Sequence, residues 1–274
     1  MILIGQYDSP FVRRVGIALT LYDLSFTHRP WSTFGDAEKI RPYNPLMRVP
    51  TLVLDNGEVL IESHIILDYL DSLVPAQRAM FPAQEPERHR ALKIAALATG
   101  LADKAVSLFY ERRLHKEVSD IWVDRCRSQI STVLAVLEAD RGERPATYWF
   151  GDRMSHADIA VAVVLRFLAD AHPGLVSMAQ FPALSAHAAA RGAAGLSGDL
   201  TAIYRAASFI EQNKVELNRP SRQLPALSSR TKGVGLNTVD IGGERKNFRC
   251  RLPTFGGRGP LHRECFEMRP VMDT

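Results

Sequence analysis

Ser9 is the first residue along the chain whose type and position favour chemistry. It follows the short apolar run MILIG and precedes Pro10. Serine as N-cap and proline as first helical residue are both preferred at the start of a helix, so capping alone explains the pair. A helix that begins just after a strand also presents a hydroxyl and free backbone N–H groups at the carboxyl edge of a sheet, where anions bind. Ser9 is therefore a candidate for capping and for holding an anionic group.

The segment around Val49-Pro50 is a second candidate position. The proline stands immediately before a predicted strand and removes one hydrogen-bond donor from the sheet. A cis bond there would turn the Val49 backbone toward a ligand, although the spacing alone favours the commoner trans form. The neighbouring Arg48 is suited to holding a carboxylate, but a lone arginine on a loop is usually solvated.

Glu62 and Ser63 form the third candidate position, where a strand is predicted to end and a helix to begin. Ser63 is a typical N-cap residue, and most such serines do nothing more. Together, the carboxylate of Glu62 could accept an ammonium group and the hydroxyl of Ser63 could donate to a carboxylate. The pair would then hold the two ends of one amino-acid-like group.

The first 76 residues alternate between strand and helix signals. Two apolar runs flank Asn56-Gly57, the dipeptide that most strongly favours a tight hairpin. The expected order is strand 1–5, helix 11–22, strand 25–31, a loop or short helix to Pro45, a hairpin over 49–63 and a helix over 64–74. The first two strands would form a parallel pair with a right-handed crossover, and the hairpin adds an antiparallel edge.

The rest of the chain divides into three parts. Residues 77–88 are rich in proline and polar side chains and are predicted to be a linker. Residues 89–212 show helical periodicity without strand signals, so an all-helical domain is expected. Its helices are predicted over Arg90–Leu114, Val118–Arg141, 154–171, 181–193 and 199–212. Residues 213–274 hold 7 Gly and 5 Pro without sustained periodicity, which predicts a disordered or loosely packed tail.

Composition excludes several classes of protein. The tail has 12 Lys and Arg against 6 Asp and Glu, a net charge of +6, and residues 1–212 carry −2. The basic character of the chain is thus no argument for nucleic-acid binding by the folded part. No apolar run approaches the roughly 18 residues of a membrane span, and no leader is evident, so a soluble cytoplasmic protein is expected. Cys126, Cys250 and Cys265 lack zinc-site spacing, so no metal is expected, and an odd number of cysteines fits a reducing compartment.

Four segments in this order resemble the glutathione S-transferase family, in particular its soluble bacterial type with serine at the first helix start. They are SPFVRRV, NPLMRVPTL, ESHIILDYL and GDRMSHADIAVA, and the resemblance covers roughly residues 1–205. It implies an α/β domain with the thioredoxin-like order βαβαββα over residues 1–76, followed by a helical-bundle domain. That fold agrees with the organisation expected from the pattern of the residues.

The resemblance also implies a role for each candidate residue. Ser9 would hydrogen-bond the sulfur of glutathione, and the Val49 backbone, before a cis-Pro50, would pair with the cysteinyl unit. Glu62 and Ser63 would bind the γ-glutamyl end. Arg48 would contact the glycyl carboxylate, although related sequences often have lysine or glutamine there. Tyr7 is the competing sulfur ligand, because other branches of the family use a tyrosine near the end of the first strand.

The implied function is a glutathione transferase that activates the thiolate for attack on a small hydrophobic electrophile. Residue 9 is not cysteine, which disfavours disulfide exchange because a mixed disulfide requires a protein thiol. Conjugation and peroxidase-like reduction both stay open. The alternative is a non-enzymatic binding or regulatory protein of the same fold. The family further implies a homodimer and glutathione as cosubstrate.

Other polar and aromatic residues have structural explanations. In MSHAD, Ser155 and Asp158 form a capping box, and Met154 and Ile159 are spaced for a hydrophobic staple, so Asp158→Ala is expected to cost about 1–2 kcal/mol. His156 is expected to face solvent in the first turn of that helix. Two arginines, Arg13 and Arg14, are expected at the surface, and Trp122 in the helical core.

Overall fold

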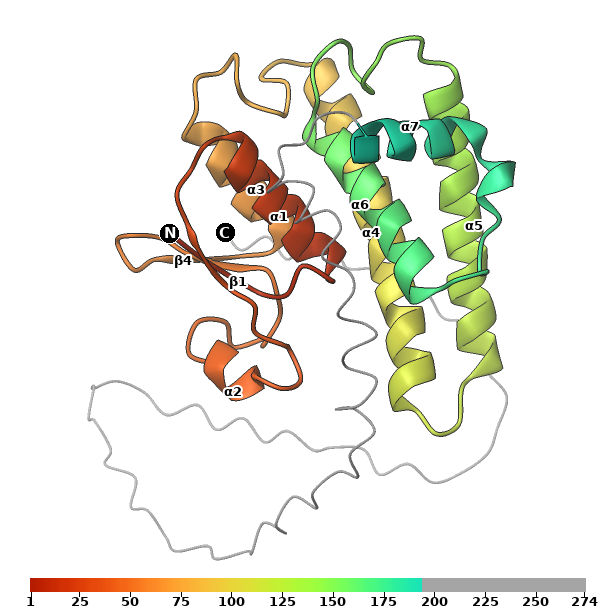
Figure 1. Ribbon diagram of the computed structural model, residues 1–274, viewed down its shortest axis with the longest axis horizontal. Helices are drawn as coiled ribbons and strands as arrows, with labels where there is room; N and C mark the ends of the chain where they lie inside the picture. The colour runs from red at the N-terminus through yellow and green to blue at the C-terminus, as the bar shows by residue number, and fades with distance from the viewer. Residues whose placement is uncertain (194–274) are drawn as a thin grey trace, which may run out of the picture. The chain divides into compact units, whose positions relative to one another are not determined.

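A four-stranded mixed sheet organises the first domain (Figure 1). The computed structural model describes residues 1–193. The strands are β1 (Ile2–Ile4), β2 (Thr27–Arg29), β3 (Thr51–Val53) and β4 (Val59–Ile61), in the order β2-β1-β3-β4. The helices of this domain are α1 (Pro10–Leu21), α2 (Ala37–Ile40) and α3 (Ser63–Ser72). β1 runs parallel to β2, and the β3–β4 hairpin is antiparallel, as expected from Asn56-Gly57.

Helices cover both faces of the sheet because alternate side chains of each strand point to opposite faces. Leu3 of β1 and Leu52 of β3 are fully buried in a core formed with α1 and α3. The next residues, Ile4 and Val53, belong to a smaller cluster with Ile40 of α2. The short strands therefore hold α1 and α3 on one face, with their N-termini close to the ends of β1 and β4.

The second domain is helical throughout the part that the structure describes. Its elements are α4 (Glu87–Leu114), α5 (Asp120–Gly142), α6 (His156–Ala171), the 3-10 helix η1 (Met178–Gln180) and α7 (Pro182–Ala193). Helix α6 packs against α4 of its own domain and against α1 of the first domain. Buried alanines of α4, among them Ala98 and Ala105, leave room for α6 to approach. A thioredoxin-like domain followed by a helical domain is thus confirmed.

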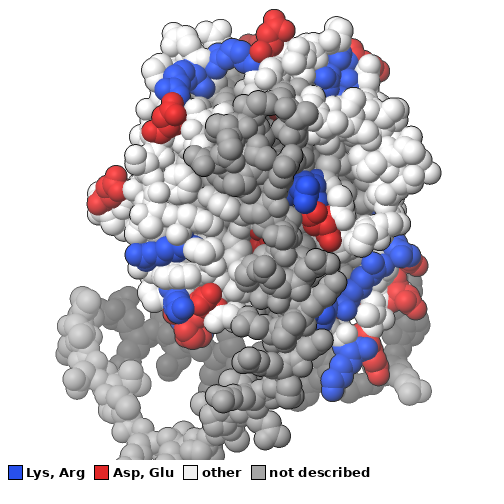
Figure 2. All heavy atoms as spheres, viewed as in Figure 1, with Lys and Arg blue, Asp and Glu red and all other residues white. Residues whose placement is uncertain are grey.

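The domain limits of 76 and 89 stay a prediction, although α3 ends at Ser72 and α4 begins at Glu87. The helix expected over 199–212 and the tail from residue 213 lie outside the described residues. None of the helices found in residues 1–193 is long and apolar enough to cross a membrane. On the face seen in Figure 2, basic and acidic side chains of the described residues lie in mixed groups.

The start of α6 confirms the expected capping box. Ser155 Oγ accepts from the Asp158 backbone N–H, and Asp158 Oδ2 accepts from the Ser155 N–H at 2.8 Å. Met154 and Ile159 belong to one apolar cluster, as a staple requires. The Asp158 carboxylate also accepts from the backbone N–H of Trp149 at 2.8 Å. It therefore fixes the preceding loop as well as the helix.

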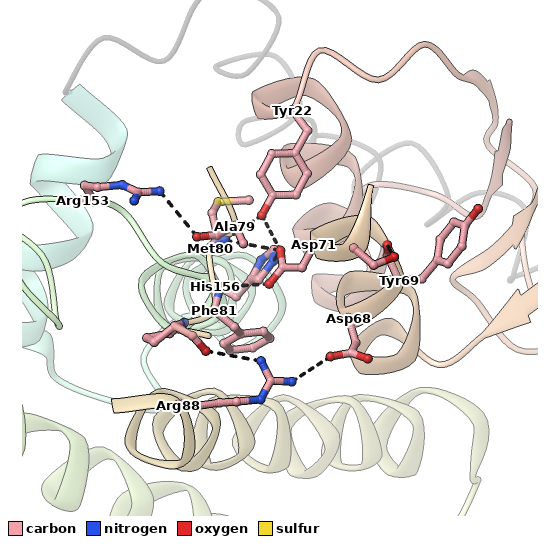
Figure 3. A network of polar contacts seen from close by, with 12 residues as sticks. Tyr22, Asp68, Tyr69, Asp71, Ala79, Met80, Phe81, Arg88, Arg153 and His156 are labelled. Atoms are coloured by element: carbon pink, nitrogen blue, oxygen red, sulfur yellow. Dashed lines mark hydrogen bonds and ion pairs between the residues drawn. The ribbon is translucent and has the colours of Figure 1, made fainter. Parts of the chain in front are cut away.

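A buried polar cluster around Asp71 joins the two domains (Figure 3). We call it the Asp71 cluster; its members are Tyr22, Asp71, Met80, Phe81 and His156. Asp71 Oδ1 accepts from the Tyr22 hydroxyl and lies 2.8 Å from His156 Nε2, and Oδ2 accepts from the Phe81 N–H at 2.9 Å. The Met80 N–H donates to the Tyr22 oxygen at 2.8 Å. Since His156 is the first residue of α6, the carboxylate also lies at the positive end of that helix.

The expectation that His156 faces solvent is therefore wrong, because the first domain covers the start of α6 and buries the ring completely. Arg13 and Arg14 are buried as well, at 0% and 2% exposure, since α1 lies between α3 and the helical domain. Trp122 is 36% exposed and is not a core residue; Lys104 Nζ lies 5.8 Å from its ring centroid. The errors at His156, Arg13 and Arg14 concern packing between helices that are distant in sequence.

Candidate functional site

Ser9 caps α1, as its sequence context predicts. Its backbone is extended, with φ −67° and ψ 123°, and its Oγ accepts from the Val12 N–H at 3.4 Å. Pro10 is the first helical residue. The Ser9 side chain is partly exposed, so its hydroxyl can donate to a ligand while it caps the helix. The N–H groups of the first turn face the same end of α1.

Gly5 brings the Val49 loop against the first turn of α1. Its φ is +130°, and a Cβ there would lie 2.6 Å from Val12 Cγ2 and 2.7 Å from Val49 Cβ. Only glycine allows this approach, because any side chain would collide with both neighbours. Val49 and Val12, whose backbone N–H donates to the Ser9 hydroxyl, therefore both pack against Gly5.

The Val49-Pro50 peptide bond is cis, as the family resemblance implies. The loop before it is held by Asn44, whose side-chain Nδ2 donates to the Arg48 carbonyl at 3.0 Å and to Thr51 Oγ1 at 3.1 Å. Thr51 Oγ1 also donates to that carbonyl at 3.0 Å. Asn44 is buried, and sequence reasoning assigned it no role, although it precedes Pro45 within the NPL segment.

The turn from β4 into α3 differs in one respect from the expectation. Glu62, not Ser63, occupies the N-cap position, and Ser63 is the first helical residue. Glu62 has φ 66° and ψ 123°, a left-handed conformation that turns the chain sharply from strand to helix. Ser63 is 4% exposed, and its Oγ accepts from Arg14 Nη1 at 3.5 Å.

Arg48 and Glu62 form an ion pair with Nη1 and Oε1 3.1 Å apart. Both side chains are substantially exposed, at 58% and 39%. The structure thus brings together two groups of predicted site residues. Ser9 and Val49 are linked through Val12 and Gly5 near the start of α1. Arg48 and Glu62 form an ion pair beside the start of α3, and the Arg14–Ser63 contact joins the two helices.

Tyr7 lies away from the helix start. Its ring stacks on His28 with centroids 4.0 Å apart, and a Cβ on Gly16 would lie 3.0 Å from its hydroxyl. Gly16 is seven residues beyond Ser9, about 10 Å along the helix axis. Burial raises the pKa of Tyr7 to about 12, which makes its phenol a weaker acid. Ser9, and not Tyr7, is the residue at the N-terminus of α1.

Aromatic side chains from the second domain lie near this region. Tyr110 of α4 packs edge-on against Phe34 with ring centroids 5.2 Å apart, and against Phe109 at 5.7 Å. Burial raises the pKa of Tyr110; a side-chain hydrogen bond with Thr33 opposes this effect, and the charge of Asp8, the neighbour of Ser9, adds to it. Burial also raises the pKa of Asp8, against the opposing effects of the Ser9 backbone N–H and Arg13. No sequence motif marks Tyr110, because its approach to Asp8 depends on domain packing.

Within the described part of the chain, no group of three or more His, Cys, Asp or Glu side chains is placed to hold a metal ion. The polar groups near the starts of α1 and α3 include hydroxyls, backbone N–H groups, the Arg48–Glu62 pair and the buried guanidinium groups of Arg13 and Arg14. Such an arrangement can bind a ligand with several charged groups along an extended backbone.

Both domains match family models. The model described as "Glutathione S-transferase, N-terminal domain" matches residues 3–78, and "Glutathione S-transferase, C-terminal domain" matches residues 120–190.

Curated relatives agree with these matches. The chain is 35% identical over 139 residues to the uncharacterized GST-like protein YibF of Escherichia coli K12, covering 50% of this chain and 68% of YibF. It is 31% identical over 169 residues to maleylacetoacetate isomerase of Pseudomonas aeruginosa, covering 58% of this chain and 77% of that protein.

Solved structures give the same result. A glutathione S-transferase from Methylobacterium radiotolerans in complex with glutathione sulfonate superposes with a TM-score of 0.67 at 29% identity, covering 73% of this chain and 93% of that chain. A glutathione transferase family member from Pseudomonas fluorescens Pf-5 with bound glutathione gives 0.62 at 29% identity, covering 74% and 97%. The order of the elements, the geometry at the helix starts and these matches lead to one conclusion: the chain belongs to the glutathione S-transferase family.

Proposed function

We propose that this protein is a glutathione transferase in which Ser9 and the N-terminus of α1 stabilise the thiolate of bound glutathione. A free thiol has a pKa of about 8.5 and is only a few per cent ionised at neutral pH. Lowering that value by about two units requires roughly 2.7 kcal/mol of preferential stabilisation of the anion. One hydroxyl hydrogen bond together with the helix N-terminus supplies an effect of this size.

The observation that carries the proposal is that Val49 and Val12, the residue whose N–H Ser9 caps, pack against the same glycine, Gly5. A cysteinyl unit whose backbone pairs with Val49 would have its sulfur beside the start of α1. In that position Ser9 need only donate one hydrogen bond to sulfur and need not lose its own proton. The distance of the Tyr7 ring from the helix start supports Ser9 as the donor.

The remaining parts of glutathione would bind the second group of residues, beside the start of α3. The ammonium of the γ-glutamyl unit would bind the Glu62 carboxylate, and its α-carboxylate would bind Ser63 at the start of α3. Arg48 would hold the glycyl carboxylate. For that role its present ion pair with Glu62 has to separate when glutathione binds.

A hydrophobic electrophile would lie beside the sulfur against Tyr110 and Phe34. The two rings contact each other, and Tyr110 is close enough to Asp8, the neighbour of Ser9, for the charge of Asp8 to act on its hydroxyl. The thiolate would attack an electrophilic carbon there, either by addition or with departure of a leaving group. With a peroxide, two glutathione molecules would instead be oxidised to the disulfide while the O–O bond is reduced to an alcohol and water. The cytoplasmic location also belongs to this proposal. So does the homodimer, for which the exposed Ile65 of α3 and Leu73, the C-cap of α3, offer apolar surface that a second copy would cover.

The ultraviolet absorbance of the thiolate tests the proposal directly. Titration of glutathione bound to the wild-type protein should give a sulfur pKa about two units below that of the free thiol. Ser9→Ala should raise that pKa by at least about one unit, because a hydrogen bond to a charged group is lost. Tyr7→Phe is the matched control and should leave it unchanged.

The outcomes separate the alternatives. If Tyr7→Phe abolishes the shift and Ser9→Ala does not, the sulfur ligand is Tyr7. If glutathione binds with an unshifted sulfur pKa, a binding or regulatory protein of the same fold is favoured. If glutathione does not bind at millimolar concentration in calorimetry, the proposed function fails.

A further inference from the structure

We propose that Arg14 is a positioning residue for the α-carboxylate of the γ-glutamyl unit, acting through Ser63 at the start of α3. This inference rests on the proposed function, because it assigns a recognition element to the glutathione that Ser9 would activate. It adds to the candidate site a residue that neither its type nor its sequence spacing had marked.

The Arg14 side chain is buried and nearly unpartnered. It is 2% exposed, and its Nη1 lies 3.5 Å from Ser63 Oγ, a long hydrogen bond. Its Nε and Nη2 are buried and have no hydrogen-bond partner among the residues that the structure describes. A guanidinium has five N–H donors, so most of the donor capacity of Arg14 is unused in this structure.

Such a group is costly unless a ligand completes it. A buried charge is normally paired, and no ion pair of Arg14 is found in residues 1–193. Burial lowers its pKa to about 10, which still leaves it charged at neutral pH. The neighbouring Arg13 differs, since its Nε donates to the Tyr7 carbonyl at 2.7 Å and it lies near Asp8. Of the two arginines, Arg14 is the one whose charge points to a missing anion.

The contact between Arg14 and Ser63 determines which hydrogen-bond donors the bound anion would meet. A serine hydroxyl has one hydrogen and two lone pairs. Because Arg14 occupies a lone pair of Ser63 Oγ, the hydroxyl hydrogen is left to donate to a ligand. Ser63 is the first residue of α3, a helix of 10 residues, so free backbone N–H groups of its first turn point the same way.

These donors and the buried positive charge together select a carboxylate over an uncharged amide or carbonyl group. A carboxylate accepts from the hydroxyl and the N–H groups and also neutralises the charge behind them. The Glu62 side chain, next in the chain, would hold the ammonium of the same unit. Arg14 thus orients the Ser63 hydroxyl and makes the start of α3 specific for a charged ligand end.

Calorimetry with two ligands tests this role in the full chain. One ligand is glutathione; the other is 4-aminobutyryl-cysteinyl-glycine, which differs from glutathione only in lacking the α-carboxylate. The measured quantity is the dissociation constant of this analogue divided by that of glutathione. A substitution that weakens the binding of both ligands equally leaves this ratio unchanged. In the wild type, glutathione should bind at least about tenfold more tightly, as expected for a hydrogen bond to a charged group.

Arg14→Met should reduce that ratio nearly to one, and Arg14→Lys, which keeps the charge, should give an intermediate value. Arg13→Met is the matched control from the same helix and should keep the wild-type ratio. Glutaryl-cysteinyl-glycine, which keeps the carboxylate but lacks the ammonium, should lose affinity in Arg14→Met as glutathione does. If Arg14→Met does not fold by circular dichroism, the ratio in Arg14→Lys decides alone.

An unchanged ratio in the folded Arg14 variants overturns the inference and leaves the proposed function intact. The same holds if the wild type binds both ligands equally, or if Arg13→Met lowers the ratio as far as Arg14→Met. If the wild type binds no glutathione, the proposed function itself has failed, and the inference fails with it.

Discussion

The α1–α3 helix pair carries a buried arginine at one end and a largely buried aspartate at the other. At one end Arg14 of α1 contacts Ser63 of α3, and at the other Tyr22, the C-cap of α1, contacts Asp71 of α3. The two contacts are eight residues apart on both helices, or about 12 Å, as expected for helices that run side by side in the same direction. One helix pair therefore supports both regions.

The regions differ in how completely their hydrogen bonds are made. Burial raises the pKa of Asp71, but hydrogen bonds from His156, Tyr22 and Phe81 outweigh it and hold the pKa below the usual value. The His156 Nδ1 atom has no partner among the described residues, yet in a neutral ring with its proton on Nε2 this atom is only an acceptor. Arg14, by contrast, leaves charged donors unused. A completed buried network is expected to support the fold, and an incomplete one to bind a ligand.

The largest expected effect on stability is at the Asp71 end of the helix pair, where the carboxylate has its hydrogen-bond donors. Asp71→Ala leaves the Tyr22 hydroxyl, the His156 Nε2–H and the Phe81 N–H buried without their acceptor, so it should lower the free energy of unfolding by about 3–5 kcal/mol. Asp71→Asn keeps one acceptor oxygen and should cost less. Urea unfolding of the ligand-free protein measures both variants. A loss below about 1 kcal/mol for Asp71→Ala would remove the distinction between the two ends.

What the sequence could predict depends on how local the cause is. The Ser9 cap, the hairpin at Asn56-Gly57 and the Ser155–Asp158 box follow from residues within a few positions of one another. The burial of His156 and Arg14 depends on helices from distant segments, and no periodicity within one helix contains that information. Val49-Pro50 lies between these cases, because the family resemblance implied its cis bond and the spacing did not.

Asp158 shows the same limit in its expected energy. As a cap alone it would contribute about 1–2 kcal/mol. The structure adds the Trp149 N–H and the Ser155 hydroxyl as donors to a fully buried carboxylate. Asp158→Ala should therefore lower the free energy of unfolding by about 3 kcal/mol, measured by urea unfolding. An unchanged unfolding curve would contradict both the cap and the added contacts.

At the Arg14 end, where donors are left without partners within residues 1–193, the expected effect on stability has the opposite sign to that of Asp71→Ala. Arg14→Met removes a buried charge that has no counter-ion among the described residues and keeps most of the apolar volume, so the ligand-free protein should be unchanged or more stable by about 1 kcal/mol. Saturating glutathione should then stabilise the variant less than the wild type, since ligand stabilisation follows affinity. A loss of about 3 kcal/mol without ligand would instead make Arg14 a structural residue like Asp71.

The pH dependence of stability is a second test of the buried network at Asp71. Burial lowers the pKa of His156, against the opposing pull of Asp71, and the charge of Arg14 lowers it further. The unfolded chain therefore binds a proton below about pH 6.5 that the native state resists, so stability is fully present above that pH and is lost as the pH falls. His28 and His172 act in the same direction, because burial lowers their pKa values too.

His156→Gln keeps a donor for Asp71 and should make the fall in stability between about pH 7 and pH 5 shallower, measured as urea midpoints across that range. His64→Gln, which replaces an exposed histidine of α3, is the matched control variant. An equal slope in wild type and His156→Gln would show that the buried histidine is not the group that titrates.

The smallest effect is expected at the exposed pair of Arg48 and Glu62. Because both side chains are solvated, Arg48→Gln should change the free energy of unfolding by less than about 0.5 kcal/mol. If Arg48 moves to the glycyl carboxylate, the variant should bind glutathione up to about fivefold more weakly and bind γ-glutamylcysteine, which lacks the glycyl unit, unchanged. Tighter binding of both ligands would instead mean that Arg48 competes with the γ-glutamyl ammonium for Glu62, so that the exposed pair restrains the site before the ligand arrives.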